Sequence, residues 1–462
     1  MIIRVRKLRC LNVAKGLVVL AMVFMISIVA NAQSLENVHQ NKQQEISLKQ
    51  ALKIAKKQNF KIKLAKSDVN ITRSQYRQTN AVFLPQVSLQ EMAVTTNDPL
   101  NVFGFKLKQE IVSAADFNPV LLNNPDRTDN YTTKVEVKQP LININGFFQR
   151  SAMKNMVKAS EEALKRTGHY MEFKVKETYY QLVLAKAKSA VIDSSLSAAK
   201  VSARQAKHFY DQGMINKADL LAAKVHVLDL ESKKGQAQNE IKDANSNLKL
   251  LLGFDNDVEL IPVDSLTMRK VNISDFDYAR INQNRSDMKA LLYQMKSSRK
   301  MLNANKFNFM PNLNVFGTYE WNDNTLFGTQ ANNYMIGASL KWDLFKGFKN
   351  VGAVEKSQAK LHKIKLTYQE KSLQNKMQIQ SAYRSLQQSK KQVRLGNAAV
   401  KQAAENLRIR SNRYAKGLEK TTDLLMAEVS LSNAQLHRLM ALFQYDVSAF
   451  SLELLTEKPL VN

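Results

Sequence analysis

The sequence predicts a mainly α-helical protein with a membrane β-barrel portion, in which long antiparallel coiled-coil helices form an α-barrel. Three observations carry this prediction. Glycine and proline are scarce, at 14 and 8 of 462 residues, which suits long uninterrupted helices. Apolar and small residues recur every 4 and 3 positions from Met171 to Tyr210, which is the heptad spacing of coiled coils. Short segments of strictly alternating polarity interrupt the helical pattern.

The chain also contains an internal two-fold repeat. The segment from Tyr210 to Leu221 aligns without a gap with the segment from Tyr414 to Leu425, at an offset of 204 residues. Each segment follows a long helical run and opens another. The repeat predicts two helical hairpins, in which Gly213 and Gly417 supply the turns because glycine tolerates a left-handed backbone.

The N-terminus has the features of a signal peptide over residues 1–32. A basic stretch precedes an apolar run over 16–30, and Ala30-Asn31-Ala32 matches a small-x-small cleavage site. The alternative is a short membrane anchor, for which the run is short. The single cysteine, Cys10, lies before the apolar run, so the mature chain is expected to have no disulfide.

Changes of hydrophobic period set the expected element boundaries. The first repeat is predicted over 33–253, with an irregular start, a helix over 47–82, strands over 85–95 and 131–141, a long loop over 96–130, and helices over 146–211 and 217–252. A connector is predicted over 254–273. The second repeat is predicted over 274–456, with a helix over 274–309, strands over 312–322 and 333–343, and helices over 348–413 and 419–455. A polar tail covers 457–462. We also expect a short helix near 105–115, and a bulge or early strand end at Glu91, whose parity places it on an apolar face.

The four strands are long enough to cross an outer membrane at a tilt. One face of each strand is apolar, and the other carries charges that suit a water-filled lumen: Lys134, Glu136, Lys138, Glu320, Lys341 and Asp343. Aromatic residues near strand ends are expected at the membrane interfaces: Tyr319, Trp321, Tyr334 and Trp342. Four strands cannot close a barrel, and open edges are not tolerated in lipid. Three chains would supply a barrel of twelve strands.

The formal net charge of +28 indicates solvated helix faces, or alternatively a basic channel wall or contacts with anionic lipid. The six histidines form no pair at metal-ligand helical spacing, and there is no phosphate loop or nucleophile elbow. The sequence therefore predicts no enzyme, no catalytic residue, no cofactor and no metal site.

Taken together, the chain resembles the TolC-like outer membrane efflux proteins over essentially its whole mature length. The resemblance rests on the doubled plan, the signal peptide, the Leu84-Pro85 and Met310-Pro311 joints, and the paired Tyr-x-x-Gly-x(5)-Asp-Leu-Leu tips. It implies a homotrimer in the outer membrane of a Gram-negative bacterium, with a periplasmic α-helical tunnel. It also implies three kinds of partner, namely outer-membrane lipid, a periplasmic adaptor protein, and an inner-membrane transporter of the proton-driven (RND) or ABC type.

The resemblance further implies that the hairpin tips close the tunnel. Asp219 and Tyr414 match the positions of a bridging pair, and Asp423 matches the first acid of an acidic ring. The second acid is replaced by Met426, and Glu419 stands where family members carry a basic residue. From the residues alone, Asp219 and Asp423 could instead favour the start of a returning helix. Tyr210 and Tyr414 could be ordinary seam residues.

The functional hypothesis is a passive outer-membrane exit duct for small molecules, with a gated periplasmic entrance. A duct for type I protein secretion is the alternative within the same family. An alternative from another class is a periplasmic or cytoplasmic coiled-coil scaffold, which could bind nucleic acid through its basic charge. The alternating strands and the signal peptide argue against the scaffold, and we expect no nucleic-acid partner.

Overall fold

A computed structural model describes residues 43–254, 258–269, 271 and 276–460. The signal peptide expected over 1–32 lies outside these residues. The described residues form two compact units. The first unit draws on 43–55, 175–267 and 396–443, and the second on 56–174, 268–395 and 444–460. Among the described residues, no helix is both long enough and apolar enough to cross a bilayer.

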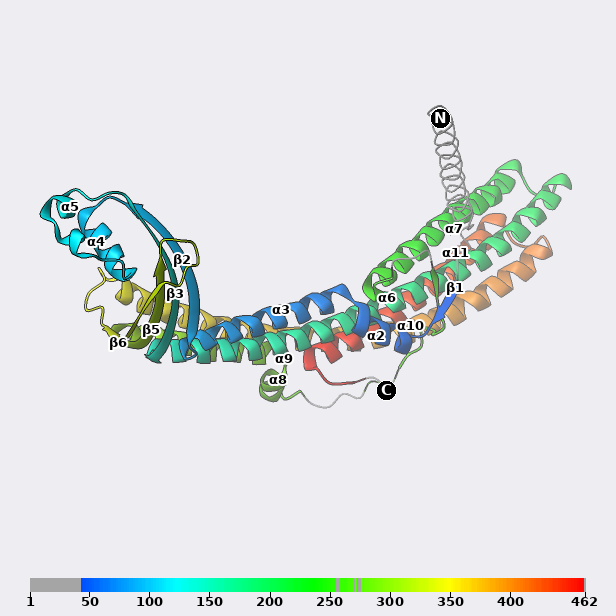
Figure 1. The fold of residues 1–462 in the computed structure, drawn as a ribbon. Coiled ribbons are helices and arrows are strands. Elements are labelled where there is room, and N and C mark those ends of the chain that lie inside the picture. Colours follow the sequence, from blue (N-terminus) through cyan, green and yellow to red (C-terminus); the bar gives the residue numbers. More distant parts are fainter. Residues whose placement is uncertain (1–42, 255–257, 270, 272–275, 461–462) are drawn as a thin grey trace, which may run out of the picture. The chain divides into compact units, whose positions relative to one another are not determined.

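Four helices dominate the chain and form two hairpins, α6 with α7 and α10 with α11 (Figure 1). Their bounds are α6 Ile144–Asp211, α7 Lys217–Leu252, α10 Lys349–Ala415 and α11 Thr421–Thr456. The two longest have 68 and 67 residues, and a helix of that length extends about 100 Å. The predicted heptad seam is confirmed along α6, where Val175, Leu182, Ile192 and Ala199 are buried.

The first unit contains a small parallel sheet that joins two segments expected to be irregular. Strand β1 (Gln43–Ile46) pairs with β4 (Glu259–Pro262). On α6, the hydroxyl of Tyr179 donates to the Ile46 carbonyl and to the Asp264 carboxylate, at 2.9 and 2.6 Å. Burial and this carboxylate raise the pKa of Tyr179. The expectation of an irregular start is therefore wrong for residues 43–45, and the predicted connector contains a short strand, because the two distant segments pair with each other.

The two short helices predicted over 47–82 and 274–309 are each broken once. The first becomes α2 (Leu48–Gln58), α3 (Phe60–Gln78) and the 3-10 turn η1 (Thr79–Val82); the second becomes α8 (Tyr278–Asn284), α9 (Ser286–Lys306) and η3 (Phe307–Phe309). The side chain of Asn59 accepts hydrogen bonds from the backbone of Lys61 and Ile62, which begins a new helix. At the second break, buried Arg285 donates to Asp287 and to the Leu455 carbonyl.

The second unit carries a four-stranded antiparallel sheet in the order β2-β3-β5-β6. Its strands are β2 Gln86–Thr96, β3 Thr128–Ile142, β5 Asn312–Asp323 and β6 Ala331–Lys341. The register pairs Leu89 with Val135 and Val315 with Ala338, so the apolar sides of the strands lie on one face of the sheet. It also pairs Lys134 with Glu320 on the opposite face.

Two expectations about the strands differ from the structure. Glu91 causes no bulge, because it accepts hydrogen bonds from the hydroxyl of Thr133 and the backbone of Phe327. The register shifts instead between Pro140 and Ile142.

The segment between β2 and β3 is more ordered than a loop (Figure 1, cyan). It contains α4 (Pro99–Lys108), the 3-10 turn η2 (Ala114–Phe117) and α5 (Pro119–Asn123). Asp98 and Asn118 cap the two α-helices, and a proline follows each at the first helical position. The Asp98-Pro99 and Asn118-Pro119 pairs therefore begin helices within the segment expected to be a long loop.

Candidate functional site at the hairpin tips

The turns of the two hairpins have the same backbone geometry. Gly213 and Gly417 both have positive φ, at 75° and 72°. Each glycine N–H donates to the carbonyl of the tyrosine three residues earlier, and the next N–H donates to the residue before that tyrosine. This is the way a glycine ends a helix and reverses the chain. The structure therefore places both glycines where the sequence predicted a turn.

The two tips pack against each other through aromatic rings. Tyr414 lies edge-on to Phe209, with ring centroids 5.4 Å apart, and Leu424 joins the same apolar cluster. Tyr414 is 1% exposed, whereas Tyr210, its counterpart in the repeat, is 38% exposed. The neighbouring Phe209 is buried in place of Tyr210. The repeat in the sequence therefore does not extend to the side-chain packing.

Asp219 and Tyr414 are near one another without a direct hydrogen bond in the described part of the chain. The Tyr414 hydroxyl lies 3.2 Å from the hydroxyl of Thr421. Burial raises the pKa of Tyr414, and the nearby charge of Asp219 raises it further. The cap of α7 is Asn216, whose side chain accepts the backbone N–H of Asp219 at 2.9 Å. Asp219 is thus an acid in the first turn of α7, where it interacts favourably with the helix dipole, and its charge acts on the buried Tyr414.

Glu419 organises the second tip. Its carboxylate accepts hydrogen bonds from Arg410 and Arg413, both at 2.7 Å, and its side chain is mostly buried. Arg410 also lies 3.5 Å from Asp423. An acid at position 419 is therefore matched by two arginines on α10, one and two turns before the turn glycine. Met426, which stands in place of a second acid, is exposed.

We expect Glu419→Gln to loosen the second tip. The glutamine keeps the size of the side chain but removes the charge that holds Arg410 and Arg413, a loss of about 1.5–3 kcal/mol. Hydrogen exchange at the Gly417 and Leu418 amides should accelerate by about tenfold or more. The matched control is Glu405→Gln, which removes the exposed pair with Arg408 on the same helix. That control should change exchange little, and equal acceleration in both variants would contradict a specific role for Glu419.

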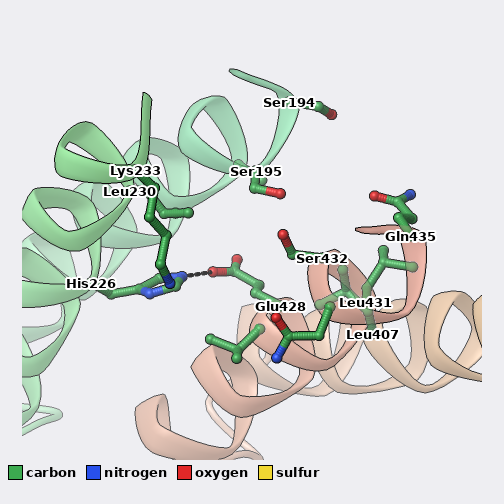
Figure 2. A pocket seen from close by; sticks show the side chains of 13 residues that line it. Ser194, Ser195, His226, Leu230, Lys233, Leu407, Glu428, Leu431, Ser432 and Gln435 are labelled. Carbon is green, nitrogen blue, oxygen red and sulfur yellow. Dashed lines mark ion pairs between the residues drawn. The ribbon is translucent and has the colours of Figure 1, made fainter. Parts of the chain in front are cut away.

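A second polar contact joins the hairpins about one turn beyond Asp423. Glu428 on α11 accepts a hydrogen bond from Ser202 on α6 at 2.6 Å and lies 3.5 Å from His226 on α7 (Figure 2). Glu428 and His226 border a cavity of about 90 Å³, which Ser195 and Ser432 also line. The sequence carries no local signal for His226, because its partner Glu428 lies on a different helix.

The remaining predicted residues lie on the sheet or just beyond the end of β6. Lys134 is 3.4 Å from Glu320, and Lys138 is 2.9 Å from Glu136. Tyr319 pairs with Tyr334 across the strands and contacts the Trp321 ring at 4.6 Å. Lys341 is the last residue of β6, so Trp342 and Asp343 lie beyond the strand predicted to contain them. Trp342 donates its indole N–H to the Phe309 carbonyl, and Asp343 pairs with Lys346.

Several solved structures share the fold of this chain. A membrane protein from Pseudomonas aeruginosa superposes with a TM-score of 0.77 at 17% identity, covering 88% of this chain and 93% of that one. The Campylobacter jejuni CmeC outer membrane channel gives 0.75 at 16%, with 88% and 85% covered. The open state of the Neisseria gonorrhoeae MtrE outer membrane channel gives 0.73 at 15%, with 90% and 89% covered. The fold is therefore that of outer membrane channels.

The family follows from the sequence itself. The outer membrane efflux protein family matches residues 32–254 and 278–456, which together include most of the chain. This chain belongs to that family. Its membership supports an outer-membrane efflux channel. No curated protein matches the chain.

Proposed function

We propose that this chain is the trimeric outer-membrane channel of a tripartite efflux pump, and that it serves as a passive exit duct for small molecules. The observation that carries the proposal is the four-stranded sheet. One of its faces is apolar and exposed, and its edge strands β2 and β6 each pair with only one strand of the described chain. Lipid does not tolerate open edges, so closure by further copies is required.

In the trimer, the charged face of the sheet lines the lumen. Lys134, Glu136, Lys138, Glu320 and Lys341 contribute to this lining. Tyr319, Trp321 and Tyr334 lie toward one membrane interface, and Trp342 lies toward the other. The register supports this assignment, because it places Lys134 opposite Glu320 and Leu89 opposite Val135. Asp343 lies beyond the strand and belongs to the mouth of the barrel on the helical side.

The hairpin tips form the gate at the periplasmic entrance. Tyr414 and Phe209 hold the second tip against the first. Glu419, with Arg410 and Arg413, fixes the shape of the second tip, and Asp219 and Asp423 supply the acidic charge at the entrance. Opening would exchange contacts between tips for contacts with a periplasmic adaptor protein, which links the channel to an inner-membrane transporter.

Purification and planar-bilayer recording test the proposal. The protein extracted from outer membranes in detergent is expected to run as a trimer and to form long-lived single channels. Recovery as a soluble monomer from the periplasm, or a trimer with no channel activity, would contradict the proposal. Deletion of the gene should raise the sensitivity of the cell to small toxic molecules, and restoration of the gene should reverse the effect.

A further inference from the structure

The segment between β2 and β3, here called the α4–α5 insertion (residues 97–127), is held firmly on the sheet. The side chain of Gln109 is buried and donates to the Asn130 side chain at 2.8 Å and to the Asp129 carbonyl at 2.9 Å. Lys108 lies 3.6 Å from Glu320. Glu320 and Asn130 belong to the polar face of the sheet, so α4 is anchored on that face at one end of the strands.

The insertion is also braced internally. Lys106 lies 2.6 Å from Asp116, which forms a capping box with Ser113. Phe103 packs edge-on to Phe117 with centroids 5.6 Å apart. A long insertion with this many side-chain contacts is an ordered structural element and not a simple spacer between strands.

Despite these contacts, the insertion leaves large apolar side chains uncovered. Leu100 on α4 is 81% exposed and Val120 on α5 is 74% exposed. Phe117 and Leu121 are exposed as well. Several large apolar side chains exposed on one braced element indicate a site of contact with another surface.

The anchoring indicates what covers this surface. When sheets from three copies close into a barrel, their polar faces turn inward, so an element fixed on the polar face at the strand ends lies over the lumen. A twelve-stranded barrel is about 25 Å across between backbones. Three helices, each about 10 Å wide, need about 22 Å when grouped around one axis. Insertions from three copies therefore have room to meet, and little room to avoid each other.

We infer that the α4–α5 insertions of three copies of this chain pack against one another through the apolar surface that includes Leu100 and Val120, and so constrict the outer end of the channel. The inference rests on the proposed trimer. The partner surface is the same insertion in a second and third copy of the chain.

Cysteine cross-linking tests this contact in the full-length protein. The only native cysteine is Cys10, within the predicted signal peptide, so the mature chain offers a cysteine-free background. Val120→Cys, treated with a short bismaleimide in outer membranes, should give covalent dimers, because each chain carries one thiol and the reagent joins two thiols. The cross-linked fraction should exceed that of the control by about tenfold, because the three thiols are held at high effective concentration. Leu100→Cys repeats the test from α4.

The control is Leu89→Cys, on the apolar face of β2 and similarly exposed. Its three copies would lie about 20 Å or more apart around the outside of the barrel. The oligomeric state is measured separately on the same samples. A trimer that cross-links at neither Val120→Cys nor Leu100→Cys would overturn the inference and leave the proposed function standing. Absence of a trimer would overturn both.

Discussion

Replacing Tyr414 with alanine is expected to open the periplasmic entrance. The side chain is buried against Phe209 and Leu424, at the point where the two hairpin tips meet. Truncation of a buried aromatic residue costs about 3–5 kcal/mol through lost contacts and the cavity left behind. If the closed state is destabilised by about 3 kcal/mol relative to the open state, the ratio of open to closed channels rises by about a hundredfold. Single-channel recording should show a higher mean conductance and more frequent open events.

Tyr210→Ala is the matched control for this experiment. Tyr210 holds the same position in the repeat but is exposed, so its removal should cost about 0.5 kcal/mol or less. A trimer must form in both variants for the comparison to report on the tips. Equal conductance in the two variants would show that Tyr414 contributes to packing alone and has no role in closing the entrance.

The second large effect concerns the buried acid Asp446 on α11. Asp446 is 1% exposed, and neither carboxylate oxygen has a hydrogen-bond partner in the described chain. Burial raises its pKa to about 7, although the charge of Arg269 acts in the opposite direction. The folded protein therefore binds a proton at pH values where the unfolded chain has lost it.

The sign of the resulting pH dependence follows from this difference. Because the folded-state pKa lies above the unfolded value, Asp446 contributes its stability at low pH and loses it as the pH rises from about 4 to about 7. Between about pH 5.5 and about pH 8, the loss amounts to about 2 kcal/mol. Asp446→Asn should remove this part of the pH dependence and raise the thermal unfolding midpoint at about pH 8.

The control for Asp446 is Asp229→Asn, which removes an exposed acid paired with Lys233 on α7. This variant should keep the pH profile of the unchanged protein, since an exposed pair contributes little. A profile for Asp446→Asn that parallels the unchanged protein between these pH values would mean that Asp446 is ionised in the folded state without cost.

Much of the fold could be predicted because it follows from the local periodicity of the sequence. Spacing between neighbouring residues is enough to predict the heptad from Val175 to Ala206, the alternation in β3 and β5, and the turns at Gly213 and Gly417. The two tips were found as a repeat, and their backbone turns have the same geometry. The candidate site was predicted only in part, because neither Arg410 nor His226 carries a local signal that points to its carboxylate partner.

What the sequence by itself determined is the doubled plan of long helical hairpins, the amphipathic strands and the turn glycines, since each of these follows from the spacing of neighbouring residues. The tertiary structure decided which tyrosine is buried at the tips, that Glu419 serves two arginines, that β1 pairs with β4, and that residues 97–127 form an anchored insertion. The reason is physical. These features depend on contacts between segments distant in sequence, where packing and hydrogen bonding override the equivalence of the repeats.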